Sequence, residues 1–242
     1  MAPLAVKVVE VAELRERVGV FRDRADAGRV LAGLLEEFRG SDAVVLAIPA
    51  GGFPVAAEIA TRLGLPLDVA VVSKVTPSWN TEVGYGAVAF DGTQRINEPL
   101  ARQLGVGPEE RRSGIEAASQ KVARRVALLR GSAHMRDLSG RRVILVDDGL
   151  ATGFTMLVAI EALQRVGAGE IAVAVPTGHV DSVRRVAERA GVVYCANLRA
   201  GPGFAVAEAY KRWHDLTDED IVAMQSERSG PRPTAGSEGH TQ

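Results

Sequence analysis

The stretch VILVDDGLATGFTM, residues 143–156, decides the fold. Its first four residues are apolar, which is typical of a strand that is buried on both faces of a parallel sheet. Two adjacent carboxylates, Asp147 and Asp148, follow directly, and then a turn of small and hydroxyl residues leads into an apolar pattern with helical spacing. This order predicts a strand, a polar turn and a helix, which is one unit of an α/β fold.

Similar units lie on both sides of this stretch. Strand-like apolar runs occupy residues 42–48, 67–73, 85–90, 141–148, 170–176 and 192–197, and helical spacing occupies 21–40, 52–64, 108–131, 153–166 and 179–191. We therefore predict the α/β class, with a mostly parallel sheet flanked by helices and a long inserted helix at 108–131. The charges of that inserted helix are expected to form a solvated face.

The predicted domain organisation is one domain over residues 1–225. Residues 226–242, SERSGPRPTAGSEGHTQ, are dominated by Ser, Gly, Pro and Thr and have no apolar period, so a disordered tail is predicted there. The N-terminus lacks the pattern of a signal peptide, and no apolar run approaches the roughly 20 residues that span a bilayer. We expect a cytoplasmic protein without membrane contact.

Composition excludes several classes of site. The net charge is −1, so binding to nucleic acid through bulk charge is not indicated. Cys195 is the only cysteine, which excludes an internal disulfide and a cysteine-based zinc site. The histidines are scattered along the chain and do not resemble a metal-binding set: His134, His179, His214 and His240.

The turn after the 143–146 run favours a phosphorylated sugar. Ligands of parallel α/β sheets bind beyond the carboxyl ends of the strands, and the free N–H groups of a helix N-terminus attract anions. Asp147 and Asp148 could accept hydrogen bonds from vicinal hydroxyls, while the turn that contains Thr152 and Thr155 could hold a phosphate. A purely structural alternative is that the two Asp residues cap the helix.

The stretch resembles the phosphoribosyl pyrophosphate signature of the type I phosphoribosyltransferases. Further segments resemble a bacterial and archaeal subgroup of that family, over roughly residues 21–225: FRDRADAG, LAIPAGGFPVAAEIA, LDVAVVSKVT, NTEVGYGAVAF, INEPL and DLTDEDIVAM. The resemblance implies the type I phosphoribosyltransferase fold, with a small hood built from about 1–30 and 198–225. It also implies Mg²⁺ as cofactor and a homodimer.

The resemblance also assigns roles to residues. Asp147 and Asp148 would contact the ribose hydroxyls and, through water, the magnesium ion. The 5′-phosphate would be held by Gly149, Leu150, Ala151, Thr152, Gly153, Phe154 and Thr155. Ala50, Gly51 and Gly52 would form the pyrophosphate loop, which in this fold often carries a non-proline cis peptide, and Lys74 would meet the pyrophosphate. Residues 75–86, with Trp79, would form the loop that closes over the site.

Three positions depart from the family pattern. The subgroup has Arg where Ala50 and Ser73 stand, so two cations that would meet pyrophosphate are missing here. The 6-oxopurine enzymes have an acid where Ala151 stands; GLATGFTM is closer to the adenine enzymes, but the predicted hood does not resemble theirs. The sequence therefore does not identify the acceptor. Candidates for contacting it are Phe204, Tyr210 and Trp213 by stacking, and Arg22 and Asp23 by polar contacts.

The predicted function is transfer of the 5-phosphoribosyl group of phosphoribosyl pyrophosphate to a nitrogenous, nucleobase-like acceptor, with release of pyrophosphate. The alternative is a regulator that binds phosphoribosyl pyrophosphate or a nucleotide on the same fold without turnover, which the missing cations favour. An NTPase is excluded because no G-x-x-x-x-G-K-[ST] occurs, and a dinucleotide site because no G-x-G-x-x-G follows a strand.

Overall fold

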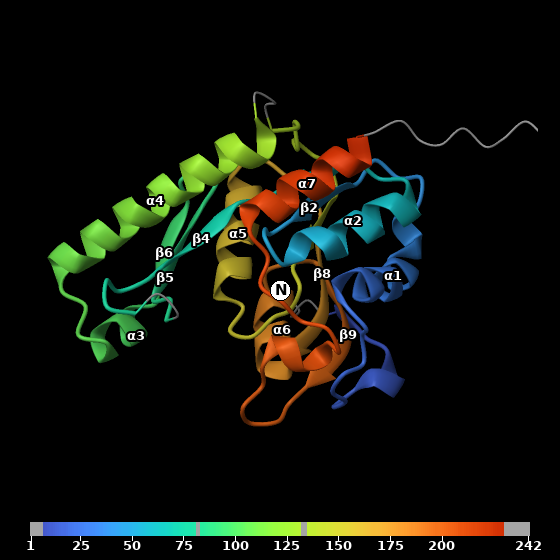
Figure 1. Cartoon of the computed structure of the whole chain (residues 1–242), viewed down its shortest axis with the longest axis horizontal. Coiled ribbons are helices and arrows are strands. Elements are labelled where there is room, and N and C mark those ends of the chain that lie inside the picture. The colour runs from blue at the N-terminus through green and yellow to red at the C-terminus, as the bar shows by residue number, and fades with distance from the viewer. Residues whose placement is uncertain (1–6, 81–82, 132–134, 230–242) are drawn as a thin grey trace, which may run out of the picture.

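The computed structural model describes residues 7–80, 83–131 and 135–229, and its centre is a six-stranded sheet (Figure 1). The strand order is β1-β9-β8-β7-β2-β3, and every neighbouring pair is parallel. The strands are β1 (Lys7–Val9), β2 (Val44–Ala47), β3 (Leu67–Val69), β7 (Val143–Val146), β8 (Ile171–His179) and β9 (Val192–Arg199). The predicted α/β class with a mostly parallel sheet is confirmed.

Both faces of this sheet are covered, as its continuous apolar runs require. Within β7, Ile144 and Val146 belong to one hydrophobic core, and Val143 and Leu145 belong to the other. The first core contains helices α1 (Arg24–Leu34) and α2 (Gly52–Leu63), and the second contains α5 (Phe154–Arg165) and α6 (Val180–Ala187). The two cores hold β7 so that the acids after it lie at the carboxyl end of the sheet.

A second, antiparallel sheet contains β4 (Val72–Val75), β5 (Gly86–Ala89) and β6 (Gln94–Ile96). Helix α4 (Pro108–Arg130) packs on it from one side and α5 from the other, and α3 (Glu98–Gln103) leads into α4 (Figure 1). The prediction of a single strand over 67–73 is wrong. The chain leaves the large sheet after Val69 and enters the small one at Val72, and the connecting residues Ala70 and Val71 are fully buried, so no polar residue signals the break.

Several predicted boundaries differ from the structure. The helix predicted over 21–40 begins at Arg24, because the carboxylate of Asp23 caps it by accepting the N–H of Asp26 (2.8 Å), and it is followed by the 3₁₀ helix η2 (Glu36–Phe38). The strand predicted over 170–176 continues to His179, because its extra residues pair with β9. Consequently α6 begins at Val180, and it ends at Ala187 instead of 191.

Helix α7 (Asp218–Ser229) lies beside α4 (Figure 1). The predicted end of the folded domain near residue 225 therefore falls inside a helix, and the start of the predicted tail at 226 is too early. The rest of that tail, 230–242, lies outside the described residues. Two further 3₁₀ helices, η1 (Ala12–Leu14) and η3 (Val206–Ala209), belong to the predicted hood. Across the described ranges, none of the helices combines the length and apolar character needed to cross a membrane.

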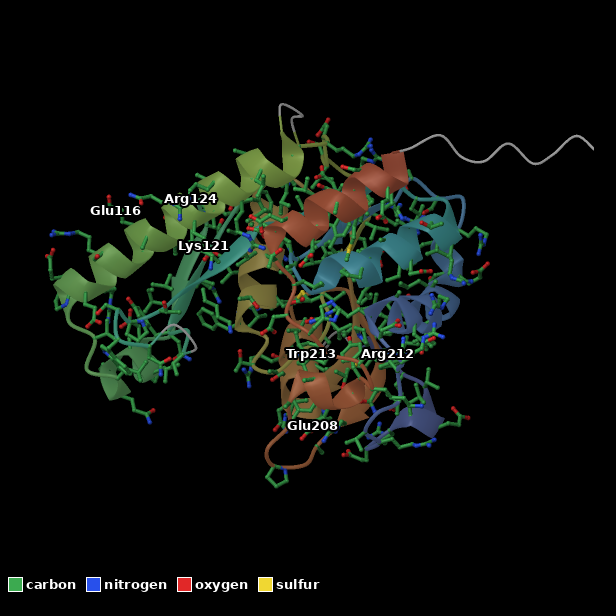
Figure 2. All side chains as sticks on the ribbon, viewed as in Figure 1. Glu116, Lys121, Arg124, Glu208, Arg212 and Trp213 are labelled. Carbon is green, nitrogen blue, oxygen red and sulfur yellow. The ribbon has the colours of Figure 1, made fainter. Side chains whose placement is uncertain are left out.

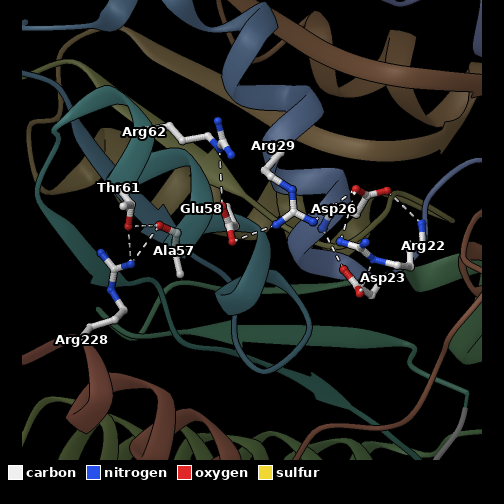
Figure 3. Close-up of polar contacts among 9 residues, drawn as sticks. All are labelled: Arg22, Asp23, Asp26, Arg29, Ala57, Glu58, Thr61, Arg62 and Arg228. Atoms are coloured by element: carbon white, nitrogen blue, oxygen red, sulfur yellow. Dashed lines mark hydrogen bonds and ion pairs between the residues drawn. The ribbon is translucent and has the colours of Figure 1, made fainter.

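Polar contacts join α1, α2 and α7 on the surface (Figure 3). Arg29 of α1 contacts Asp26 in its own helix and Glu58 in α2, each at 3.2 Å. Beneath them the two helices approach so closely that a Cβ on Gly28 would lie 2.6 Å from the carbonyl oxygen of Val55. Arg228 of α7 donates to the carbonyl of Ala57 in α2. These contacts fix the start of α1, which carries Arg24 toward the acid pair.

Candidate functional site

The site lies where β2 and β7 end side by side. Ala47 and Val146 are register partners at the carboxyl ends of these strands, and the N–H of Ile48 donates to the carbonyl of Val146 at 2.8 Å. The turn after β2 therefore lies against the acids that follow β7. The peptide bond between Pro49 and Ala50 is cis, as the family resemblance implied for this turn.

Glycines allow the two turns to pack this tightly. A Cβ on Gly51 would lie 1.9 Å from Oδ2 of Asp148, and one on Gly52 would lie 2.6 Å from the carbonyl oxygen of Val146. On the other side of the acids, a Cβ on Gly149 would lie 2.3 Å from Cγ1 of Val206 in η3. Each position requires a residue without a side chain, which explains why the glycines surround the acid pair.

Asp148 is the internally bonded member of the acid pair. Nε of Arg24 donates to its Oδ2 at 2.8 Å, and both side chains are largely buried. The hydroxyl of Tyr210 donates to the backbone carbonyl of Asp148 at 2.5 Å. Burial raises the pKa of Asp148, and the Arg24 charge opposes that rise. Asp148 thus connects the strand end to the predicted hood.

Asp147 faces the open space. It lines a cleft of about 390 Å³, and its Oδ1 accepts the N–H of Asp148 at 2.8 Å. Burial, followed by the charge of Asp148, raises the pKa of Asp147 well above that of an ordinary carboxyl. The addition of a cation or of hydroxyl donors at this point would relieve the repulsion between the two acids.

The turn after the acids forms a cradle at the start of α5. Gly153 has φ +72° and provides no side-chain cap; Thr152 Oγ1 accepts the N–H of Phe154 at 3.4 Å, and the N–H groups that follow it can meet an anion. Helix α6 holds the turn in place, because Ser182 Oγ donates to the carbonyl of Ala151 at 2.6 Å and Arg185 donates to that of Thr152 at 3.2 Å. Hydrogen bonds from α6 therefore hold the predicted phosphate loop in a defined conformation.

Leu150 differs from its neighbours in this turn. Its side chain is buried in the core, its N–H donates to the carbonyl of Thr177, and its carbonyl accepts the N–H of His179. No group of Leu150 is left to contact a ligand directly. The exposed part of the loop consists of Ala151 and Thr152, and Phe154 and Thr155 are half-buried.

The opposite wall of the cleft comes from β4 and α4. Ser73, Lys74 and Thr76 line it from the strand side, and Gly114, Ala117, Ala118, Lys121 and Arg125 line it from the helix. A second hollow of about 220 Å³ shares Lys74 and Thr155 with the cleft and adds Thr152 and Gly84. The predicted closing loop thus borders the phosphate loop. Its residues 81–82 lie outside the described ranges, and Trp79 is 60% exposed.

The aromatic residues of the predicted hood have different surroundings. Tyr210 is buried between Phe21 and Trp213, so it does not offer a free face for stacking. Phe204 lies against His179 and Arg199. Trp213 remains 37% exposed, and the guanidinium of Arg24 lies 3.8 Å from its ring centroid.

The polar candidates of the hood have structural partners. Asp23 is the N-cap of α1, and Arg22 is paired with Asp23 at 3.2 Å and with Asp26 at 3.8 Å. Of the three aromatic candidates, Trp213 is the exposed one, and Arg24 and Tyr210 pack against its ring.

The donor set at the acid pair fits a magnesium ion bound mainly through its substrate. Within the described ranges, no group of three or more His, Cys, Asp or Glu side chains could enclose a metal. Two adjacent carboxylates beside an anion cradle suit Mg²⁺, which keeps several waters and binds through one or two carboxylates plus substrate phosphates. His179 instead caps α6, and His134 and His240 lie outside the described residues.

Three residues of the site were not identified from the sequence: Arg24, Lys121 and Arg125. Arg24 lies 124 positions before its partner Asp148, and no local pattern indicates such a contact. For α4, a signal was present: Gly114, Ala117, Ala118, Lys121 and Arg125 recur at helical spacing, which marks one face. The small residues on that face could have indicated a cleft.

Comparisons with known proteins agree with this geometry. A family profile described as "Phosphoribosyl transferase domain" matches residues 23–207. A Mycobacterium tuberculosis protein named "Putative phosphoribosyl transferase" is 37% identical over 211 residues, which make up 85% of this chain and 46% of that protein. The chain thus spans about half the length of this relative. The adenine phosphoribosyltransferase of M. tuberculosis is 29% identical over 163 residues, 67% of this chain and 60% of that protein.

A solved structure shares the fold closely. The crystal structure of TT1426 from Thermus thermophilus has a TM-score of 0.68 and 34% sequence identity, and the match covers 87% of this chain and 99% of that one. The profile match alone extends over most of the chain and includes the acid pair, both loops and Lys74. The chain therefore belongs to the phosphoribosyl transferase domain family.

Proposed function

We propose that this chain binds phosphoribosyl pyrophosphate and transfers its 5-phosphoribosyl group to a nitrogenous acceptor, with release of pyrophosphate. One observation carries the proposal. Asp147, Pro49 at the start of the glycine turn, Thr155 at the start of α5 and Lys74 all line one cleft, and the neighbouring hollow shares Lys74 and Thr155 and adds Thr152. Each of these features suits a different part of one substrate, namely the ribose hydroxyls, the 5′-phosphate and the pyrophosphate.

The proposed reaction is a displacement at C1 of the ribose. The lone pair of the acceptor nitrogen forms the new C1–N bond, and the C1–O bond breaks with its electron pair leaving on pyrophosphate. A proton on the acceptor nitrogen passes to solvent or to the leaving group. A transition state with oxocarbenium character, similar to that of glycoside hydrolysis, needs no protein nucleophile.

The residues of the site would act by position and charge. Asp147 would accept hydrogen bonds from the ribose hydroxyls, Thr152 and Thr155 would bind the 5′-phosphate, and Lys74 would attract the pyrophosphate. When bound through water to Asp147 and Asp148, Mg²⁺ would supply further positive charge against the leaving group. The loop 75–86, which borders the hollow at Lys74 and Thr155, would limit the access of water.

The acceptor is proposed only as a class. Trp213 is 37% exposed beside Arg24, and its exposed aromatic surface would suit contact with a flat nitrogenous base. Adenine is the acceptor named for one relative, and the structure gives no contact that selects adenine over other bases. The homodimer and the cytoplasmic location expected from the sequence remain predictions.

A regulator that binds phosphoribosyl pyrophosphate or a nucleotide without turnover is the second candidate. The observation that favours it is the absence of charge at Ala50 and at the buried Ser73, where the subgroup has Arg. Binding without pyrophosphate release for any nitrogenous base would support this alternative.

The test begins with calorimetric titration of phosphoribosyl pyrophosphate plus Mg²⁺. We expect the native protein to bind and Asp147→Asn to lose most of its affinity. Asp42→Asn is the matched control, because it makes the same change at an exposed position before β2, at the opposite edge of the sheet. The native protein is then screened with nitrogenous bases for pyrophosphate release. If native protein and both variants fail to bind, the proposal is wrong.

A further inference from the structure

One face of the inserted helix α4 forms a wall of the cleft. Gly114, Ala117 and Ala118 line it first, and Lys121 and Arg125 follow on the same face. The same cleft is lined by Ser73 and Lys74 from β4 and by Pro49 and Asp147 from the strand ends of the large sheet. The charges of α4 were expected to form a solvated face, and most of them are exposed; Lys121 and Arg125 in addition line the cleft.

Lys121 is the free cation of this wall. Figure 2 shows it on the side of α4 that faces β4, whereas Glu116 and Arg124 lie above the helix in that view and do not line the cleft. Its side chain is exposed, and no hydrogen bond or ion pair engages it within the described part of the chain. Lys74, on β4 across the cleft, is likewise exposed, and its side chain makes no hydrogen bond or ion pair with the described residues. Two uncompensated ammonium groups thus line the same cleft as Asp147.

Arg125 has a different role from Lys121. Asp218 of α7 neutralises it through contacts of 2.6 and 2.9 Å, and both side chains are largely buried. Its Nη1 also lies 3.4 Å from the carbonyl oxygen of Pro49, which belongs to the cis peptide of the pyrophosphate turn. Arg125 therefore connects α4 to that turn and keeps the preceding helical turn, with Lys121, beside it.

We propose that Lys121 is a pyrophosphate-binding residue, which supplies from the inserted helix positive charge that Ala50 and Ser73 do not provide. The proposal rests on the proposed function. It assigns Lys121 to the pyrophosphate and not to the 5′-phosphate, because Lys121 lines the cleft with Pro49 and Ser73 and is absent from the second hollow, which contains Thr152 and Phe154 of the phosphate loop.

The test compares Lys121→Ala with Arg124→Ala. Both substitutions remove one exposed cation from the same turn of α4, but Arg124 does not line the cleft. Calorimetry measures three ligands on each protein: phosphoribosyl pyrophosphate and inorganic pyrophosphate, both with Mg²⁺, and ribose 5-phosphate, which lacks the pyrophosphate. Lys121→Arg tests whether a cation restores binding. Thermal unfolding verifies that each variant is folded.

We expect Lys121→Ala to weaken both pyrophosphate-containing ligands about 10- to 100-fold, the usual range for a hydrogen bond to a charged group. The affinity of Lys121→Ala for ribose 5-phosphate should stay within about twofold of that of the native protein. Arg124→Ala should bind all three ligands within about twofold of native affinity. Lys121→Arg should recover most of the affinity that Lys121→Ala loses. If native protein binds phosphoribosyl pyrophosphate but Lys121→Ala weakens it no more than Arg124→Ala, the inference is wrong and the proposed function stands. If native protein binds none of the three, both are overturned.

Discussion

Gly51→Ala is the substitution that tests the packing of the site most directly. The added Cβ would lie 1.9 Å from Oδ2 and 2.4 Å from Cγ of Asp148, far inside the roughly 3.5 Å of ordinary contact. The clash can be relieved in two ways. If the turn moves, the change is one of overpacking, which typically costs about 1–3 kcal/mol of stability. Moving the carboxylate would separate Asp148 from Arg24, and breaking a buried ion pair costs about 3–5 kcal/mol.

The expected loss of stability lies between the costs of these two movements. The Asp148 side chain is 16% exposed, which lowers the cost of the second movement below its fully buried value. We therefore expect Gly51→Ala to lower the free energy of unfolding by about 2–4 kcal/mol. Gly33→Ala is the control: it lies within α1, a Cβ there meets nothing within 4 Å, and a gain of about 0.5–1 kcal/mol is expected.

The assay is equilibrium unfolding in urea, arranged as a double-mutant cycle. The atoms nearest to the added Cβ all belong to the side chain of Asp148, so Asp148→Ala removes the clash. In that background Gly51→Ala should cost little, which gives a coupling of about 2 kcal/mol or more between the two positions. Additivity within about 0.5 kcal/mol, or a loss below that value for Gly51→Ala alone, would refute the reasoning.

Three further predictions follow from burial and hydrogen bonding. Because burial and Asp148 raise the pKa of Asp147, its contribution to stability is complete below the ordinary carboxyl pKa and is lost as pH rises through the elevated one. The urea midpoint of Asp147→Asn should therefore rise relative to that of the native ligand-free protein as the pH increases above the ordinary carboxyl pKa, and parallel midpoint curves would contradict this. Tyr210→Phe removes the donor to the Asp148 carbonyl and should cost about 1 kcal/mol in the same assay; an unchanged midpoint would show that this bond contributes nothing. Cys195 is fully buried, and burial raises the pKa of its thiol, so a thiol reagent should modify it only at the rate of unfolding in urea, whereas rapid labelling of native protein would be the opposite result.

The sequence predicted the centre of the site because its signals are local. An apolar strand, two acids and a small-residue turn are adjacent in the chain, and parallel pairing of β2 and β7 brings the glycine turn to the same edge. What the sequence did not predict depends on distant partners. Nothing near Arg24 indicates that it pairs with Asp148, and nothing in Ala70 or Val71 indicates that the chain changes sheets there. For the same reason the sequence could not predict that Lys121 faces the cleft, since a charged helix does not indicate which of its faces another element will cover.

The two walls of the cleft belong to different sheets. The acid pair and the start of α5 follow strands of the large parallel sheet, while Lys74 lies on the small antiparallel sheet and Lys121 on the helix packed against it. Positive charge can therefore be gained or lost on one wall without any change in the strands that carry the acids. Substitutions along α4 offer evolution, or an engineer, a separate means of tuning how strongly the site holds an anion. Sites of this kind are best compared by the total charge around the cleft, because its walls come from separate parts of the chain.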